Sequence, residues 1–357
     1  MNHFIYFRAL KHAEHTVFCV EKGQKTFRDA QFGKSMAYSS GQQVKRSILE
    51  AVSSELNMPF APTTFVFNVD KKKQLGEGEA WSACNPAYID QLLGGWMKAE
   101  SGGENRTLKR RSPFSISAMR PLHPLLATYV KENLTFDRSD KPENQDIIIK
   151  DANGKVLSTE EVQDLLTGTN RSLHRKWVPD NARTTGLFVH DVALDLRTLF
   201  AVSLNEFEPE IRPETAEKLR AEGWIEGETV FGKSLIAPKE LRDKVIPAIA
   251  HALINWRVTT NQSRTFSLME TLAVAISPNA NKLAAAIRTK LKEEEDKVEP
   301  IVDDSLENVA TFITLPAAGY IRTNTESADA LEKAEENLIE MMQRYPYENQ
   351  LQEVALA

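Results

Sequence analysis

A short segment near the N-terminus constrains the fold of this chain more than any other. Residues 40–43 read Ser-Gly-Gln-Gln, the capping-box pattern in which the Ser40 hydroxyl caps a helix and Gln43 reaches back to it. Pro59 ends the helical pattern. The apolar positions after the cap recur every fourth residue, as on the buried face of an amphipathic helix: Val44, Ile48, Val52 and Leu56. A packed helix is therefore predicted here.

Two cations, Lys45 and Arg46, lie close to the start of this helix. A helix N-terminus carries partial positive charge and unpaired N–H groups, so acidic residues are the stabilising choice there. Cations in this place indicate a bound anion, and phosphate is the natural candidate. Gly41 would let the backbone of a ligand approach closely. The spacing leaves open a plain capped helix with two solvated cations.

Short β-type segments flank the helix. Residues 3–7 and 63–69 are rich in aromatic and β-branched side chains, which is typical of strands. Residues 21–35 are polar and contain glycine, as in a loop or hairpin. The sequence thus predicts a β–α–β opening.

Residues 71–120 lack a core pattern and resemble a long insertion. Residues 137–155 are polar with a turn signal at Asn153-Gly154, and residues 169–183 are again basic. Long irregular insertions of this kind commonly carry function. Cations beside an aromatic residue such as Trp177 fit single-strand binding by phosphate contact and stacking. Solvated loops, with Trp177 anchored in the core, are the alternative. The basic positions predicted to bind RNA in these insertions are Lys109, Arg110, Arg111, Arg171, His174, Arg175 and Lys176.

Regular structure returns at Gly186. A strand is predicted over residues 187–196, with a bulge near Asp191 where the alternation slips. Pro247 should kink or divide one of the later helices. The further elements predicted are helices at 214–221, 239–254, 281–295 and 328–344 and a strand at 268–276. The layout is α+β, with one sheet interrupted by two basic insertions.

Composition limits the classes of function. The net charge of −6 counts against nucleic-acid binding, but the acidic excess lies late, in residues 290–304 and 326–340. Two cysteines fit a reducing cytosol, and no apolar run of about 18 residues predicts a membrane span. A cytoplasmic protein without a membrane partner is expected. Common catalytic and nucleotide-binding motifs are absent, so no catalytic residue, metal or cofactor is predicted.

The run AYSSGQQVKRSIL, residues 37–49, resembles the helix-start motif of the CRISPR-associated backbone family, the Cas-seven or DevR-type subunit of type I Cascade-like complexes. The order of segments is similar too: an opening strand, this helix, a long insertion, a mid-chain insertion and a return strand. Residues 255–264 loosely resemble a late polar loop of that family, without its glycines.

The resemblance implies an RRM-like (ferredoxin-like) palm with large fingers and thumb insertions. The palm would be residues 1–70 with 186–320, the fingers 71–168, the candidate thumb 169–185, and the C-terminal helix and tail 321–357. Ser39, Ser40, Gln42, Lys45 and Arg46 would contact the backbone of the guide RNA, and Arg257 and Arg264 of the late loop complete the predicted RNA-binding set.

The resemblance also implies a role. Copies of the chain would oligomerise into a helical filament along the CRISPR RNA (crRNA), each thumb displacing one nucleotide, and hold the guide for pairing with target nucleic acid in antiviral defence. Other Cascade subunits would be partners, and the chain would be non-catalytic.

Two other functions stay open. Some type III relatives cleave target RNA with a loop aspartate and a divalent metal, and Asp29 lies in the corresponding region. The acidic composition favours a soluble metabolic enzyme or scaffold without RNA.

Overall fold

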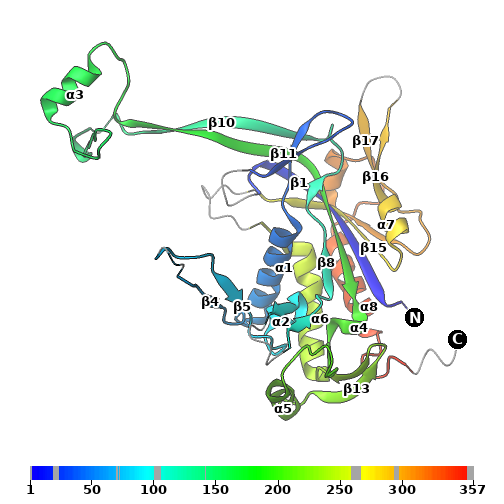
Figure 1. Cartoon of the computed structure of the whole chain (residues 1–357). Coiled ribbons are helices and arrows are strands. Elements are labelled where there is room, and N and C mark those ends of the chain that lie inside the picture. Colours follow the sequence, from blue (N-terminus) through cyan, green and yellow to red (C-terminus); the bar gives the residue numbers. More distant parts are fainter. Residues whose placement is uncertain are drawn as a thin grey trace.

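The computed structural model describes residues 2–18, 24–69, 71, 73–99, 106–140, 142–258, 267–292 and 297–351. Helices and strands pack into one body, from which a long two-stranded ribbon projects (Figure 1). The predicted α+β class is confirmed. None of the helices in the described residues is long and apolar enough to cross a membrane.

One antiparallel sheet organises the body. Its strand order is β10 (Ala127–Asp137), β11 (Arg175–Asp195), β1 (Phe4–Thr16), β15 (Glu270–Ser277) and β18 (Ala310–Ile313). Two short strands, β8 (Phe114–Ile116) and β9 (Arg120–Pro121), pair with the body half of β11. The opening strand predicted at residues 3–7 is confirmed and runs nine residues further.

The central strands are covered on both faces. Phe7 of β1 belongs to the larger apolar cluster and Leu10 to a second cluster on the other face. In β11, Val189 and His190 are both buried although they point to opposite faces. This double burial explains the irregular alternation, and the predicted bulge near Asp191 is wrong. The β1–β11 register runs without a break from Phe4↔Asp195 to Ala13↔Gly186.

Three helices, α1 (Gly41–Leu56), α6 (Lys239–Asn255) and α8 (Ala330–Gln343), pack together on one face of the sheet (Figure 1). The predicted start of α1 is confirmed, because the Ser40 hydroxyl accepts the N–H of Gln43. Val44, Ile48 and Val52 are fully buried, as the stripe predicts.

Two details of these helices differ from prediction. The Gln43 side chain accepts a hydrogen bond from the Ser39 hydroxyl at 3.1 Å, whereas the capping box predicts a bond to the Ser40 N–H. The predicted division of α6 at Pro247 is wrong, since the helix continues from Lys239 to Asn255. Burial of its apolar residues against α1 and α8 outweighs the lost backbone hydrogen bond.

The other face of the sheet carries α7 (Ala280–Ala286), the hairpin of β16 (Ile287–Leu291) with β17 (Val298–Val302), and the short helix η2 (Leu315–Gly319). The helix predicted at residues 281–295 is therefore only half right. Ile287 starts β16 and is fully buried in the second cluster, so tertiary packing replaces helix by strand.

The remaining elements lie outside the main sheet. The strand predicted at residues 63–69 forms β4 (Thr64–Val66), which pairs with β5 (Glu79–Trp81) and not with β1, so the predicted β–α–β opening is wrong. The others are β2 (Thr26–Arg28) with β3 (Ser35–Ala37), α2 (Ile89–Gly94), β6 (Trp96–Lys98) with β7 (Leu108–Arg110), η1 (Pro142–Asn144), α3 (Thr159–Leu166), α4 (Leu196–Leu199), α5 (Pro213–Ala221), and the sheet of β12 (Ala201–Ser203), β14 (Gly232–Ile236) and β13 (Ile225–Thr229).

The projecting ribbon consists of β10 and the first half of β11, paired from Ala127↔Gly186 to Asp137↔Arg175. It carries α3 at its far end (Figure 1). At the root of the ribbon, Gly186 has a φ of +147°, and a Cβ there would lie 2.3 Å from the carbonyl oxygen of Leu126. Only glycine fits this crossing from sheet to ribbon. The ribbon pairs residues of the predicted fingers with residues of the predicted thumb.

A buried lysine lies where β1 meets the end of α6. The Lys11 ammonium donates to Thr271 Oγ1 at 2.7 Å and to the Ile254 carbonyl at 3.3 Å, over the ring of Trp256. Burial lowers the pKa of Lys11 to about 7, and the nearby charge of Arg257 adds to this effect. The Lys11 ammonium therefore stabilises a carbonyl at the C-terminus of α6. Burying its charge lowers the free energy of unfolding by an amount that depends on pH.

We expect the free energy of unfolding to rise between pH 7 and pH 10.5, because over this range the unfolded chain holds a proton at Lys11 that the folded chain has released. The pKa difference corresponds to on the order of 5 kcal/mol. Urea unfolding at several pH values measures it. The difference between wild type and Lys11→Met should change steadily across this range, and a constant difference would contradict the assignment.

Candidate nucleic-acid interface

The hairpin of β2 and β3 leads directly into α1 and places several cations beside the helix start. Its turn is held by Asp29, whose Oδ1 accepts the N–H groups of Gln31 at 3.0 Å and Phe32 at 2.8 Å. Backbone bonds between Ser39 and Met119 then fix the entry to α1. The hairpin and the helix start thus form one continuous edge of the body.

We call this edge the hairpin–helix surface. Phe27 is 39% exposed and its ring meets Tyr38 edge-on, with ring centres 5.7 Å apart. Residues 24–46 carry five cations and one carboxylate, a net charge of +4 in a chain of net charge −6. Positive charge beside an exposed aromatic ring is the combination that binds single-stranded nucleic acid. The exposed cations of the surface are Lys25, Arg28, Lys34 and Arg46, and Gln42 is exposed beside them.

Two of the residues predicted to contact RNA serve the fold of the helix start. Ser39 is fully buried and its hydroxyl donates to Gln43. The Ser40 hydroxyl caps the helix N-terminus by accepting the N–H of Gln43. Their side chains hold α1 in place, while the neighbouring Gln42 is exposed.

Lys45 points away from the helix N-terminus. Its ammonium donates to the Gly94 carbonyl at 2.9 Å and to the Ser112 hydroxyl at 2.7 Å. Burial lowers the pKa of Lys45, and the charge of Arg110 lowers it further. The inference that Lys45 marks an anion site at the helix N-terminus is therefore wrong in this structure, because the side chain ties α1 to the segment after α2.

Arg46 does face solvent. Its side chain is 61% exposed, pairs with Glu50 at 2.6 Å and lies over the ring of Phe60. An exposed ion pair of this kind is weak, so the guanidinium can exchange Glu50 for a phosphate at little cost. Of the five motif residues, Gln42 and Arg46 are the two exposed ones.

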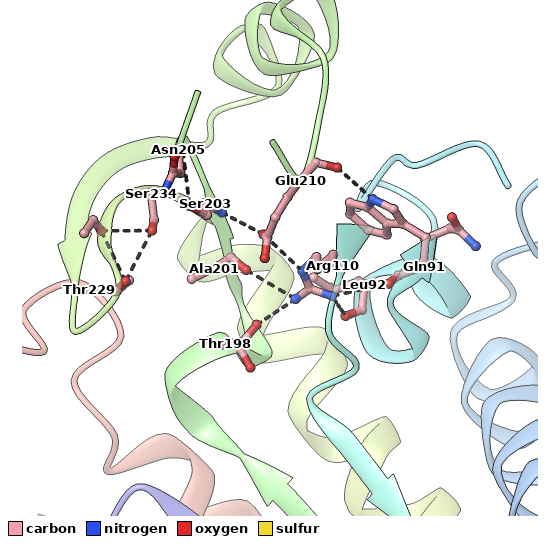
Figure 2. A network of polar contacts seen from close by, with 12 residues as sticks. Gln91, Leu92, Arg110, Thr198, Ala201, Ser203, Asn205, Glu210, Thr229 and Ser234 are labelled. Atoms are coloured by element: carbon pink, nitrogen blue, oxygen red, sulfur yellow. Dashed lines mark hydrogen bonds and ion pairs between the residues drawn. The ribbon is translucent and has the colours of Figure 1, made fainter. Parts of the chain in front are cut away.

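The first basic insertion shows strand alternation. On β7 and just after it, Lys109 and Arg111 are exposed, whereas Arg110 between them is 3% exposed. Figure 2 shows the Arg110 guanidinium donating to the carbonyls of Leu92 at 2.5 Å, Thr198 at 2.6 Å and Ala201 at 3.2 Å. The structure contradicts the predicted RNA contact at Arg110, because its donors are directed to the interior.

Glu210 and Trp96 complete this buried network. The Glu210 carboxylate lies 3.9 Å from Arg110 Nε (Figure 2). The Trp96 indole donates to the Glu210 carbonyl at 2.7 Å. Burial lowers the pKa of Arg110 to about 10, against the opposing effect of Glu210, so the guanidinium is charged at neutral pH. The network joins α2 and β7 to α4 and β12.

The second basic cluster lies near the far end of the ribbon. Arg175 pairs with Asp137 across the two strands at 2.5 Å, and the ring of His174 contacts the Gln145 amide at 2.9 Å. Arg171 and Lys176 are exposed, with no side-chain partner among the described residues. The ribbon carries this cluster away from the hairpin–helix surface, so the structure does not join the two (Figure 1).

The late loop is described only at its start. Arg257 is exposed directly after α6. Arg264 lies outside the described residues, so its predicted contact stays a prediction.

A metal site finds no support in the described ranges. They contain no group of three or more side chains of His, Cys, Asp or Glu suited to hold a metal ion. One carboxylate oxygen of Asp29 is already engaged in the hairpin turn. The aspartate thus has a structural role that explains its presence without a metal.

The cations of the β2–β3 hairpin were not among the residues predicted from sequence. Lys25 and Arg28 precede the turn and Lys34 follows it. The sequence has cations on both sides of a turn that runs from Asp29 to Gly33, directly before a capped helix, and this pattern could have identified them. Their separation from the motif in sequence hid that they share its surface.

Comparison with known proteins gives only distant matches. No family model and no curated protein matches the chain. One similar solved structure is described as "CRISPR RNA-guided surveillance complex, pre-nicking", with 11% identity, 95% of this chain and 88% of the other covered, and a TM-score of 0.44. Another is described as "CRISPR RNA-guided surveillance complex", with 11% identity, 96% and 85% covered, and a TM-score of 0.39. Both overlaps are too loose to assign fold or function by themselves.

Proposed function

We propose that this chain is a non-catalytic, guide-RNA-binding backbone subunit of a type I Cascade-like CRISPR complex, working in the cytoplasm. The observation that carries the proposal is the hairpin–helix surface. It brings four exposed cations, against one carboxylate, and the exposed ring of Phe27 around the segment that resembles the family's helix-start motif. Phosphate contacts of this kind position RNA without reading its sequence.

The topology supports an RRM-like palm. Along the body the strands lie in the order β8, β11, β1, β15, and α1 and α6 follow β1 and β11 in the chain. Taken alone, these elements run β1–α1–β8–β11–α6–β15, which is the split β–α–β arrangement of ferredoxin-like folds. RRM domains present an open sheet face to RNA, whereas both faces of this sheet are covered, so in the proposed complex the RNA contacts the hairpin–helix surface at the edge of the palm.

The shape and position of the ribbon fit those expected of the thumb. The ribbon is narrow, it projects from the body at Gly186, and it ends near the exposed cations Arg171 and Lys176 (Figure 1). In the proposed complex the thumb is residues 127–186 and not only 169–185. It would reach over the guide RNA and displace a nucleotide.

The end of the ribbon supports assembly with further copies. α3 has no buried residue, and in the segment between β10 and β11 four apolar side chains are more than 40% exposed. Exposed apolar clusters mark contact surfaces. A head-to-tail contact made by such a tip would generate a helical filament. The four residues, which we call the tip cluster, are Ile147, Ile148, Val156 and Leu165.

Assembly on RNA of increasing length tests the proposal. We expect the wild-type chain to form larger particles in proportion to guide length, measured by mass photometry. Ile148→Asp with Leu165→Asp should bind RNA but form only short oligomers. The control, Asn153→Asp with Gln163→Asp, adds the same charge at exposed polar positions and should assemble normally. Equal assembly by both variants would contradict the role of the tip cluster.

In this account other Cascade subunits cap the filament, and the held guide pairs with target nucleic acid. Cleavage of target RNA at Asp29, the second candidate, has no supporting observation beyond the position of this aspartate before α1. Asp29→Asn distinguishes the two candidates. A nuclease should lose metal-dependent cleavage of target RNA on this change, whereas a backbone subunit should show no such cleavage in either form and should keep its RNA affinity.

A further inference from the structure

The hairpin of β4 and β5 exposes an apolar ladder that the body does not cover. Its two strands pair with each other and with no other strand among the described residues, and Figure 1 shows them projecting from the body beside α1. Phe65 is 65% exposed, Phe67 51%, Val69 65% and Leu75 70%. An isolated two-stranded hairpin is marginally stable in water, so a ligand that covers this face stabilises it.

The two phenylalanine rings form a platform. Phe65 lies in β4, and Phe67 follows one residue after the end of this strand, with its ring against Gly78 of the facing segment. Residues two apart in an extended chain leave the same face. Small residues lie opposite: Ala80 pairs with Phe65, and a Cβ on Gly78 would come within 2.2 Å of the Phe67 ring. With no bulky neighbour across the hairpin, the outer faces of both rings are open.

Charge continues this platform at the turn. Residues 71–73 are three consecutive lysines, and Lys71 and Lys73 are exposed. The nearby Glu79 belongs to the opposite face, since it pairs with Val66, and its carboxylate accepts the indole N–H of Trp81 at 3.2 Å. The two rings thus lie toward the same end of the β4–β5 hairpin as the exposed ammonium groups, and on the opposite face from the Glu79 carboxylate.

We infer that the β4–β5 hairpin is a second binding site, for an unstacked segment of single-stranded nucleic acid. Two bases stack on Phe65 and Phe67, and the flanking phosphates contact Lys71 and Lys73. Residues i and i+2 of a strand are roughly 6.6 Å apart, which suits an extended strand better than a stacked one with its rise of about 3.4 Å per nucleotide. The inference rests on the proposed function for the class of ligand but concerns a different surface.

The test separates stacking from apolar contact. Phe65→Leu with Phe67→Leu keeps an apolar face and removes the rings. Val69→Ala with Leu75→Ala removes equally exposed apolar groups of the same hairpin and keeps the rings. Binding of fluorescein-labelled oligouridylate to the full-length chain is followed by fluorescence anisotropy. Circular dichroism melting checks folding, which none of these exposed changes should disturb.

We expect the leucine double variant to bind the oligonucleotide about tenfold or more weakly than wild type. The alanine variant should bind like wild type, and Phe65→Trp with Phe67→Trp should bind at least as tightly. An oligonucleotide of abasic sites should show no difference between wild type and the leucine variant.

Equal binding by wild type and the leucine variant would overturn the inference and leave a protein partner as the ligand of this face. Equal losses in the leucine and alanine variants would overturn it too, since general apolar contact would then suffice. If the wild type binds no RNA at all, the proposed function fails as well. If it binds and only these variants are indistinguishable, the proposed function stands and this site alone is refuted.

Discussion

Replacing Arg110 with methionine is expected to lower the free energy of unfolding by about 3–5 kcal/mol, the usual cost of removing one partner of a buried charged network. The change leaves the carbonyls of Leu92, Thr198 and Ala201 without their donor and Glu210 without its counter-charge. Such groups are costly when they stay buried and unpaired. Urea unfolding followed by circular dichroism measures the loss.

The neighbouring residue supplies a matched control. Arg111→Met removes the same charge from an exposed position and should change stability by no more than about 0.5 kcal/mol. Burial raises the pKa of Glu210 although Arg110 opposes this, so Arg110→Met with Glu210→Gln should recover part of the loss by removing the isolated carboxylate. An Arg110→Met protein that is as stable as Arg111→Met but binds RNA weakly would contradict the structural role.

Reversing three charges of the hairpin–helix surface should weaken RNA binding by about 100-fold, or about 2.7 kcal/mol. The variant carries Lys25→Glu, Arg28→Glu and Lys34→Glu, all at exposed positions. Each phosphate contact contributes a slope of about 0.7 to the dependence of binding on salt for single strands. Loss of three contacts should therefore reduce that slope by about 2, which filter binding at several salt concentrations measures.

A second triple variant controls for total charge. Lys218→Glu, Lys233→Glu and Lys244→Glu change the net charge by the same amount at exposed positions on α5, β14 and α6. This control should bind RNA nearly as wild type does. Equal losses in both variants would show a general charge effect and would remove the hairpin–helix surface as the site.

Local patterns in the sequence predicted local structure well. Ser40 and the stripe from Val44 onward gave α1 to within one residue, because cap and core face act within a few turns. The strand at β15 and the helices α5 and α8 follow from the same periodicities. These elements depend on contacts that are close in sequence or on one buried face.

The wrong predictions concern elements whose ends or strand pairing depend on contacts between residues far apart in sequence. The end of α7 at Ala286 depends on the burial of Ile287 against a sheet that other segments build. The pairing of β10 with β11 joins residues about fifty positions apart, and no local pattern encodes it. For β4, strand propensity was correct while its place in the sheet was not.

The candidate site was predictable only in part. Charge alone does not show which face of a strand a residue takes, so Arg110 looked equivalent to Lys109 and Arg111 although alternation on β7 buries it. Lys45 resembles Arg46 in sequence, but the partners that draw it inward, Gly94 and Ser112, are far along the chain. The motif located the start of α1, and the fold decides which of its side chains are exposed.

The most direct test of the central claim is the nucleic-acid content of the chain purified after co-expression with a CRISPR array. Its ultraviolet absorbance shows whether RNA is bound, and gel analysis gives the length of that RNA. The account predicts a discrete RNA carried by a large oligomer, lost in the Lys25→Glu, Arg28→Glu, Lys34→Glu variant. A wild-type monomer with the absorbance of protein alone, even at low salt, would contradict it.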